Sequence, residues 1–537
     1  MQPERRRHYE DRGLLTAERF GQLFDSAVEQ WPDRELLNYE GERYSYLELW
    51  RWVVHVAHAL VDSGLRPGDH ILNQMSNSAE SIVLQFAVWR IGCINVPVIP
   101  VYREHEVRQI IADTRPVAIV ATAQVRNRNL CNEIAGVLAE LPGLSPRLLS
   151  FSEAAPAGWH RLPAAPDAAV QVDGAGLPDP ADSRECAMIL YTSGSTSAPK
   201  GAMLTGEAIL ANSRAYIRSN QLTASYVGLA GSPLGHIAAL SICMTTPMLL
   251  GGRSVVMSHW KPDEAVAHVL AERVTMIGGP PIFTSDIVDR LETMGRRLEW
   301  QMLSQTGGAP IAPEIVRRAE AVGIRAVPVY GMTETTGAAA MCRLDDPLDR
   351  RAEWHGRAIW GTEIEAVDDE RRRLPADEIG ELRIRSPQLM LGYTDPDISA
   401  QQIDADGWFY TGDLGIIDAE GWVRVVGRLK EIINRGGEKF SAQDIEQALG
   451  GHPDIAAAAV VGGPHERLGE IVVAFLKLRP DVAWQGPERL LAYLDGLKLS
   501  KQKFPEAWHI VDELPMSATG KIQKKELVAR LKYTIDS

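Results

Sequence analysis

The sequence contains little cysteine. Its five cysteines, Cys93, Cys131, Cys186, Cys243 and Cys342, form no CxxC pair. An odd number of cysteines without framework spacing is typical of a reduced protein. We therefore expect neither a disulfide scaffold nor a metal cluster, and we place the chain in the cytoplasm. A chain of 537 residues can bury a core large enough to do without such cross-links.

Long apolar runs are also missing. The longest, residues 236–250, is interrupted by Ser, Thr and Pro. It is also shorter than the roughly 20 residues that a membrane-spanning helix needs. We interpret it as a buried core helix and expect no membrane span. The charged N-terminus is not followed by the apolar stretch of a signal peptide.

Positive charge is in deficit. Lys and Arg total 56 against 70 Asp and Glu, which gives a net charge of −14. This balance argues against nucleic acid as a partner. The deficit is confined to residues 1–429, because residues 430–537 hold 15 residues of each sign. Of the 12 lysines, only Lys200 and Lys261 precede Lys430. The change predicts two domains, 1–429 and 430–537.

Short apolar runs alternate with amphipathic helical patterns through residues 20–430, which is typical of an α/β fold. The tail has a different order: a strand, a GG turn, a helix, the apolar strands 455–461 and 471–478, and another helix. This order predicts a small α+β unit. Ser441, with Asp444 three residues later, predicts a capping box at the start of the first tail helix.

The most distinctive local feature is a loop of small residues between the apolar strand 187–191 and Lys200. Hydroxyls and closely approaching backbone N–H groups can hold phosphate oxygens, and the lysine adds a positive charge. On composition alone, a surface turn rich in Ser and Gly is the alternative. The residues expected to contact phosphate are Thr192, Ser193, Gly194, Ser195, Thr196 and Lys200.

The loop YTSGSTSAPKGAMLT resembles the phosphate-loop signature of the adenylate-forming superfamily, which includes acyl- and aryl-CoA ligases. Further motifs of that family follow in the family's order: TGGAP at 306–310, YGMTE at 330–334, YTGD at 410–413, GRLK at 427–430, GGEKFSA at 436–442 and PMSATGK at 515–521. The resemblance implies an α/β fold. A large N-terminal domain of packed mixed sheets flanked by helices would carry a small, mobile α+β C-terminal lid.

The resemblance also implies binding of ATP and Mg²⁺. Tyr330 would stack on adenine, with Gly308 and Ala309 along the edge of the base. Thr333 would hydrogen-bond the α-phosphate. Glu334 would hold Mg²⁺, since this ion prefers carboxylate oxygens. Taken alone, a Tyr-Gly pair is usually only a strand end, so these roles depend on the whole set of motifs.

The remaining motifs imply roles in chemistry and in domain movement. Asp413 would accept the ribose hydroxyls, and Arg428 would add donors on the ribose and phosphate side. Lys521 would be the catalytic cation between the acid and the α-phosphate, because a positive charge lowers the repulsion between two anions. Lys430 would be the hinge about which the lid rotates. Without its motif, Lys521 would be interpreted as a solvated lysine.

The second half-reaction would form a thioester with coenzyme A. The loop at Gly436 and Gly437 would line the pantetheine tunnel, and His236 would act as a gate between this tunnel and the acid. A lone histidine is more often structural, and that alternative stays open.

The acid pocket is predicted to be apolar. Residues 235–241 contain no carboxylate to pair the ammonium of an amino acid. Small and apolar lining residues favour a bulky alicyclic, aromatic or terpenoid acid, read with few polar contacts. A medium-chain fatty acid is the alternative. The expected lining residues are His236, Ile237, Ala238, Gly307, Gly308, Gly331, Met332 and Gly337.

The chain ends shortly after Lys521, so we expect a diffusible acceptor: coenzyme A, or alternatively a freestanding carrier protein. A catalytically silent ligand-binding homologue is the alternative of a different class. We expect a monomer or a homodimer. Three positions depart from the family pattern: Ser197 and Gly206 where the family has Gly and His, and Ala442 where it commonly has Pro.

Overall fold

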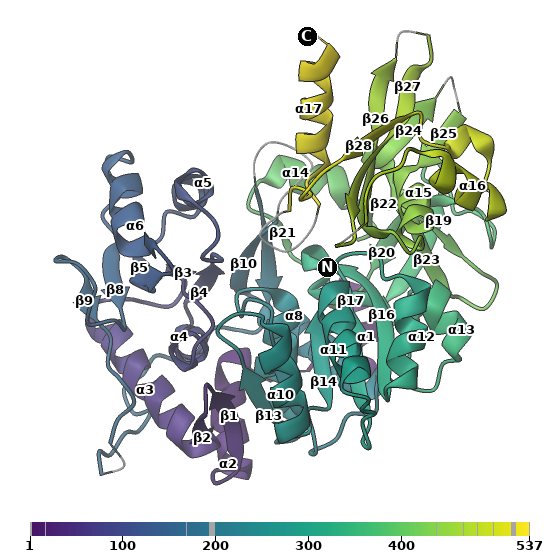
Figure 1. The fold of residues 1–537 in the computed structure, drawn as a ribbon. Helices are drawn as coiled ribbons and strands as arrows, with labels where there is room; N and C mark the ends of the chain where they lie inside the picture. Colours follow the sequence, from purple (N-terminus) through teal and green to yellow (C-terminus); the bar gives the residue numbers. More distant parts are fainter. Residues whose placement is uncertain are drawn as a thin grey trace.

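The computed structural model describes residues 3–16, 18–167, 169–192, 199–435, 438–465, 467–480, 482–497, 499–516 and 522–535. The first 430 residues contain two large sheets flanked by helices, as the alternating pattern predicts (Figure 1). The nine-stranded sheet has the order β18 (Arg357–Ala358), β17 (Gly337–Met341), β16 (Ile324–Met332), β15 (Met302–Thr306), β14 (Met276–Gly279), β12 (Val227–Ala230), β13 (Arg253–Val256), β1 (Glu35–Tyr39) and β2 (Glu42–Ser45).

The second large sheet has eight strands. Its centre is parallel, and β10 and β11 form an antiparallel hairpin towards one edge. The order is β21 (Gly392–Tyr393), β11 (Lys200–Thr205), β10 (Cys186–Thr192), β4 (Ile94–Pro97), β3 (His70–Gln74), β5 (Ala118–Ala121), β8 (Arg147–Ser150) and β9 (His160–Arg161). A short ribbon, β6 (Gln124–Val125) and β7 (Arg128–Asn129), lies apart from it.

Helices cover both sheets. In the first half of the chain they are α1 (Pro3–Asp11), α2 (Leu23–Gln30), α3 (Tyr46–Asp62), α4 (Ala79–Arg90), α5 (Glu104–Thr114), α6 (Leu130–Ala139) and α7 (Gly206–Ser219). In the second half they are α8 (Ile237–Leu240), α9 (Thr246–Leu250), α10 (Pro262–Glu272), α11 (Pro281–Thr293), α12 (Pro313–Ala321), α13 (Leu348–Glu353) and α14 (Pro396–Gln402).

The main core lies between the two sheets. It joins Ile71 and Met188 of the eight-stranded sheet to Val256 and Met276 of the nine-stranded sheet. Nine residues in succession in α4, Ser81 to Trp89, are buried, as is Ala79, which is expected for a helix enclosed on all sides. Most of the apolar run 236–250 is also buried; it forms α8, a π-helical turn at Ser241–Thr245 and α9. None of the described helices is long and apolar enough to cross a bilayer.

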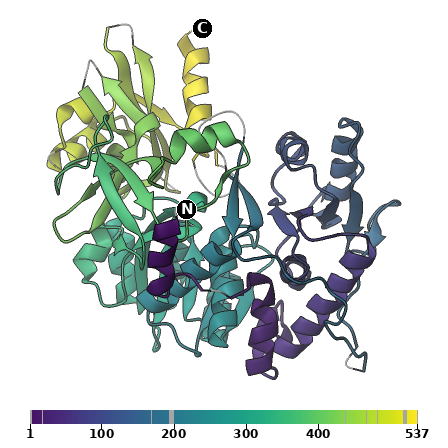
Figure 2. The ribbon, with the colours of Figure 1, turned by 180° about the vertical axis from the view of Figure 1, so that it is seen from behind.

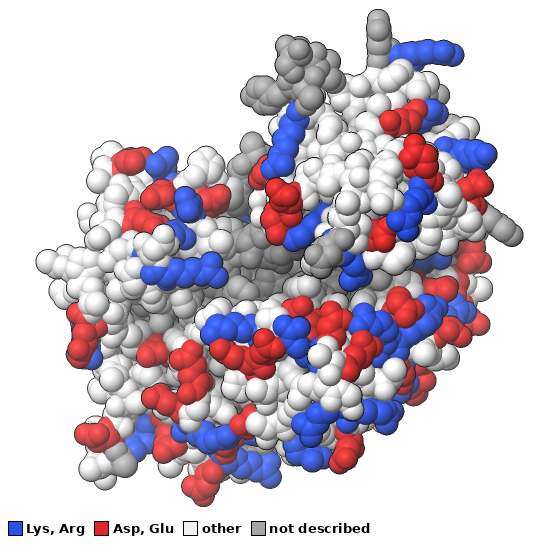
Figure 3. Space-filling model, viewed as in Figure 1, with Lys and Arg blue, Asp and Glu red and all other residues white. Residues whose placement is uncertain are grey.

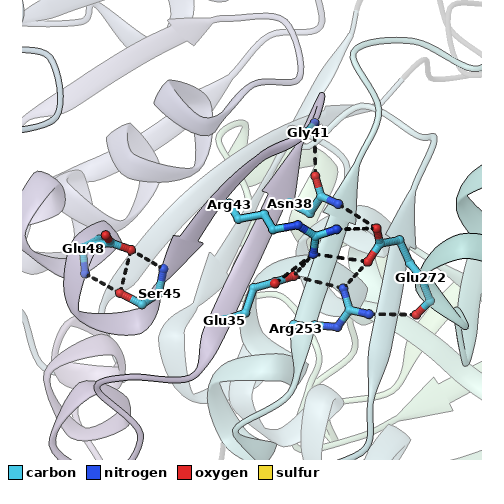
Figure 4. Close-up of polar contacts among 8 residues, drawn as sticks. All are labelled: Glu35, Asn38, Gly41, Arg43, Ser45, Glu48, Arg253 and Glu272. Carbon is cyan, nitrogen blue, oxygen red and sulfur yellow. Dashed lines mark hydrogen bonds and ion pairs between the residues drawn. The ribbon is translucent and has the colours of Figure 1, made fainter.

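Ion pairs fasten the edge of the nine-stranded sheet (Figure 4). Arg43 of β2 and Arg253 of β13 both bind Glu272, the last residue of α10, at 2.7 and 2.6 Å. The same two arginines contact Glu35 at 2.8 and 3.0 Å. This network joins the β1–β2 hairpin to a parallel strand more than 200 residues away. Near the N-terminus, Arg6 of α1 pairs with Glu207 of α7 at 2.6 Å, which holds α1 on the back of the large domain (Figure 2).

A four-stranded sheet leads into the C-terminal unit. It has the order β19 (Glu363–Val367), β20 (Gly380–Arg385), β22 (Phe409–Ile417) and β23 (Val423–Arg428). The C-terminal unit has its own core and a sheet of β25 (Glu438–Ser441), β24 (Ile432–Arg435), β27 (Gly469–Leu478), β26 (Ile455–His465) and β28 (Ala507–Ile510). Its helices are α15 (Ala442–Gly450), α16 (Glu488–Gly496) and α17 (Lys524–Ile535). The small α+β unit is thus confirmed; the boundary at residue 430 stays a prediction.

The capping-box prediction was wrong. Ser441 does stand at the N-cap of α15, but its side chain makes no cap hydrogen bond. Its hydroxyl instead donates to the carbonyl oxygen of Val426, across the junction between the two domains. Asp444 pairs with Lys503 at 3.0 Å. Contacts between distant segments have taken the place of the local cap.

Candidate active site

The phosphate-side lysine lies on the β10–β11 hairpin. Lys200 is paired with Thr192, so the hairpin brings the two ends of the serine-rich loop together. Ser193, Gly194, Ser195 and Thr196 lie outside the described residues. The Lys200 ammonium lies 5.3 Å from the centre of the Tyr393 ring. Burial lowers the pKa of Lys200, and the positive charge of Lys430 lowers it further, while Glu334 and Asp395 act in the opposite direction.

The candidate metal ligand lies on a tight turn after β16. Glu334 belongs to the 3₁₀ turn Thr333–Thr335, and its side chain is 9% exposed. Thr335 closes the turn: its hydroxyl accepts the Met332 N–H at 3.0 Å and donates to the Gly337 carbonyl at 2.7 Å. The hydroxyl of Tyr393 donates to Oε1 of Glu334 at 2.8 Å. The turn and the tyrosine together fix the direction of this carboxylate.

Three of the predicted nucleotide residues lie in contact with one another. The hydroxyl of Tyr330 donates to Oδ2 of Asp413 at 3.0 Å, and Nε of Arg428 lies 2.9 Å from Oδ1. Asp413 and Arg428 face each other in the β22–β23 register, which explains their pairing. The Asp413 side chain is buried, and its charge raises the pKa of Arg428. The arrangement gives a fixed carboxylate beside a guanidinium.

On the acid side, His236 caps α8. Its Nδ1 accepts the Ala238 N–H at 3.4 Å, so the proton of the neutral ring lies on Nε2. Ile237 is buried and Ala238 is half-buried. These three positions begin the segment that the sequence assigned to the acid pocket; whether His236 acts as a gate stays a prediction.

The glycines of the predicted pocket need a different interpretation. A Cβ on Gly307 would lie 2.5 Å from Cγ2 of Val329. On Gly331 it would lie 2.0 Å from the Gly337 carbonyl oxygen, and on Gly337, whose φ is +118°, 2.8 Å from Oδ1 of Asn212. Protein atoms therefore occupy the space that these glycines leave. They permit close packing of chain segments, and their number says nothing about the size of the acid.

Two buried polar groups in this part of the fold carry no signal in the sequence. Ser241 Oγ and Gln305 Oε1 are buried, and no described residue hydrogen-bonds to either atom. Ile242, the residue after Ser241, lies close to Gln305. A Cβ placed on Gly278 would lie 2.0 Å from Cδ1 of Ile242 and 3.6 Å from Oε1 of Gln305. Whether few polar groups contact the acid stays a prediction.

The lid residues are only partly described. Gly436, Gly437 and Lys521 lie outside the described residues, as does Ser197. Lys430 lies in the 3₁₀ turn Leu429–Glu431 and is exposed. On the face of the molecule that Figure 3 shows, the surface is hollowed beneath the C-terminal unit. Charged residues of both signs are interspersed on the surface around this hollow.

The presence of glycine at position 206, where the family has histidine, has a structural explanation. A Cβ at this position would lie 2.4 Å from Cβ of Phe20. The N-terminal segment therefore occupies the place of the side chain. The departure reflects packing of Phe20 against the start of α7.

Comparison with known proteins gives the family. Residues 24–394 match the family described as AMP-binding enzyme, and residues 444–521 match the AMP-binding enzyme C-terminal domain. The chain is 32% identical to the medium-chain fatty-acid–CoA ligase of Escherichia coli (strain K12), over 98% of this chain and 94% of that protein. It is 32% identical to the indoleacetate–CoA ligase of Aromatoleum aromaticum, over 93% of this chain and 96% of that protein.

Solved structures agree with the fold. ATP-bound MatB from Rhodopseudomonas palustris superimposes with a TM-score of 0.83 at 28% identity, covering 95% of this chain and 99% of that one. The amide bond synthetase McbA from Marinactinospora thermotolerans gives a TM-score of 0.84 at 26% identity, covering 95% and 99%. The large domain of mixed sheets with a small C-terminal unit is thereby confirmed.

Proposed function

Because the chain belongs to the AMP-binding enzyme family, we propose that it joins a hydrophobic carboxylic acid to coenzyme A through an acyl-adenylate. The reaction class is that of an ATP-dependent acid–thiol ligase. A carboxylate oxygen of the acid attacks the α-phosphorus of ATP, and pyrophosphate leaves. The thiol sulfur then attacks the acyl carbon, AMP leaves, and the thiol proton passes to solvent.

The observation that carries this proposal is the grouping of opposite charges around one site. Burial, and after it the charge of Lys430, lower the pKa of Lys200, and the carboxylates of Glu334 and Asp395 only partly offset them. A polyphosphate supplies the missing negative charge. Asp413, held by Tyr330 and Arg428, supplies acceptors for ribose hydroxyls. This donor set fits ATP.

The residues near Glu334 fit a divalent cation. Mg²⁺ binds through one or two carboxylates together with phosphate oxygens, and when bound it neutralises phosphate charge. Glu334 offers a directed, largely buried carboxylate with one oxygen held by Tyr393. Thr333, in the same turn, would donate to the α-phosphate, and Tyr330 would lie beside the base with Gly308 and Ala309.

The lid would complete the catalytic site. Lys521 would place its ammonium between the carboxylate of the acid and the α-phosphate. After adenylation, rotation about Lys430 would withdraw Lys521 and bring Gly436 and Gly437 to the pantetheine arm. His236 would then separate the acid from the thiol channel.

For the substrate, we propose a bulky alicyclic, aromatic or terpenoid acid, with a medium-chain fatty acid as the alternative. Two relatives are named for a medium-chain fatty acid and for indoleacetate, and a third, from Amycolatopsis sp, is named feruloyl-CoA synthase. All three are hydrophobic acids. The support in this chain is the absence of any carboxylate at residues 235–241.

A panel of acids tests the proposal. The enzyme is incubated with ATP, Mg²⁺ and each acid, pyrophosphate release is measured, and products with coenzyme A or with a freestanding carrier protein are identified by mass spectrometry. We expect the strongest release with a ring-bearing hydrophobic acid and a thioester of coenzyme A. A strongest signal from a proteinogenic amino acid would refute the substrate proposal. Release with none of the acids would favour a silent ligand-binding homologue.

A further inference from the structure

Tyr393 contacts both charged groups on which the adenylation site depends. We infer that it is a positioning residue that directs Glu334 towards the metal and holds the Lys200 ammonium apart from that carboxylate. The inference rests on the proposed function, because it assigns phosphate to Lys200 and Mg²⁺ to Glu334.

The position of Tyr393 is set by backbone pairing. It lies on β21, where it pairs with Ala202 of β11, and the N–H of Thr394 donates to the Gly201 carbonyl at 2.8 Å. The N–H of Tyr393 donates to Oγ of Ser399 at 2.8 Å. The side chain is 3% exposed. The tyrosine is therefore hydrogen-bonded to β11, the strand that begins with Lys200, and its partner Ala202 is two residues after that lysine.

The hydroxyl acts on Glu334. It donates to Oε1 at 2.8 Å, which leaves Oε2 to face a cation. Burial, and after it the charge of Glu334, raise the pKa of the Tyr393 phenol far above its usual value. A carboxylate held in this way is oriented before the metal arrives, as outer-shell donors orient ligands at metal sites.

The ring acts on Lys200. The ammonium lies 5.3 Å from the ring centre, within the range of a cation–π contact. Glu334 raises the pKa of Lys200, so the two charges attract each other, yet no ion pair joins these two described residues. A direct pair would neutralise both groups and compete with phosphate and metal. The ring occupies the position that keeps them separate.

Two variants separate the two actions. Tyr393→Phe removes the hydroxyl and keeps the ring, and Tyr393→Leu removes both. Tyr44→Phe is the matched control, since the Tyr44 hydroxyl also donates to a carboxylate, Glu42, at 2.8 Å, but on β2 far from the site. Acid-dependent ATP–pyrophosphate exchange is measured while Mg²⁺ and ATP are varied in turn, with thermal melting as the control for folding.

We expect Tyr393→Phe to raise the half-saturating Mg²⁺ concentration about tenfold, as loss of an outer-shell ligand partner does. Its KM for ATP at saturating Mg²⁺ should stay within about twofold of the wild-type value, because the cation–π contact remains. Tyr393→Leu should raise both values, the KM for ATP by about fivefold, since Lys200 then pairs with Glu334. Tyr44→Phe should change neither.

A double-mutant cycle tests the route of the effect. In a Glu334→Gln background, Tyr393→Phe should cause no further change in the Mg²⁺ requirement, because the carboxylate that it orients is gone. An unchanged Mg²⁺ requirement in Tyr393→Phe, or the same KM for ATP in the Phe and Leu variants, would overturn the inference.

Failure of the proposed function would look different. The wild-type enzyme would then show no exchange with any acid. In that case Mg²⁺-dependent ATP binding, measured by calorimetry on the same variants, decides the inference, and the same order of effects is expected. Equal affinities in wild type and both variants would refute the role of Tyr393.

Discussion

Replacing Lys524 by methionine should destabilise the packing of helices and strands within the C-terminal unit. Lys524 is the first residue of α17, and its ammonium lies 2.7 Å from Glu431 Oε2 and 2.8 Å from Glu446 Oε1. Glu446 Oε1 also accepts the Val460 N–H of β26 at 2.7 Å. One lysine therefore joins α17, α15 and the turn that contains Lys430.

The magnitude follows from burial. The side chains of Lys524 and Glu446 are each 17% exposed, whereas Glu431 is 35% exposed and better screened by water. Removing one partner of a buried ion pair costs about 3–5 kcal/mol. With these exposures we expect the lower end, about 3 kcal/mol, which corresponds to roughly a hundredfold change in an opening equilibrium.

Hydrogen exchange measures this change locally. Mass spectrometry of the β26 peptide should show the Val460 amide exchanging about a hundredfold faster in Lys524→Met, while peptides of the large domain keep their rates. Lys525→Met is the matched control, because Lys525 is the next residue along the same helix and is exposed.

The effect should depend on pH. Burial raises the pKa of Glu446, and Lys524 opposes this shift. Without the lysine, the pKa rises further, so the folded variant takes up a proton more readily than the unfolded chain, and its stability increases as pH falls. In the wild type, burial lowers the pKa of Lys524, but Glu446 and Glu431 outweigh burial and raise it overall, so the lysine stays charged over this range. The difference between variant and wild type should therefore be larger at pH 8 than at pH 5. Equal exchange rates, or a difference independent of pH, would refute this reasoning.

Two further predictions concern the half-reactions. Lys521→Ala should abolish adenylate formation from acid and ATP but largely spare thioester formation from supplied acyl-adenylate; pyrophosphate release at the wild-type rate would show that this lysine is not catalytic. Lys430→Pro should fix φ at the hinge, so acyl-AMP should accumulate while acyl-CoA formation collapses. Both products are measured after quenching, with circular dichroism as the folding control, and equal loss of both half-reactions in a folded variant would count against the hinge.

The sequence predicted the elements that depend on local pattern or on motif order. The strands β10, β26 and β27 follow apolar runs, and the meeting of Tyr330, Asp413 and Arg428 agrees with the motifs that contain them. Local pattern was not sufficient where a distant segment competes. The Ser441 hydroxyl is taken by Val426, so the cap expected from its own helix does not form.

Other features could not be read from the sequence because they depend on chain segments that meet only in the fold. Gly337 owes its lack of a side chain to Asn212, 125 positions earlier in the chain. Tyr393 lies on a strand of two residues, too short for any periodic signal, and its importance comes from Lys200 and Glu334. The sequence around such a glycine or tyrosine does not indicate which distant residues it contacts in the fold.

The ion network at the edge of the nine-stranded sheet has a consequence for synthesis on the ribosome. Glu35 lies 218 positions before Arg253, and β1 pairs in parallel with β13. At roughly 5–20 residues per second, β1 emerges about 10–40 s before its partner strand. During that interval the buried Leu36 and Leu37 have only the β2 side of their sheet available. The edge of β1 that pairs with β13 therefore stays unpaired until the middle of the chain is synthesised. Nascent chains shorter than about 260 residues should expose that edge to chaperones.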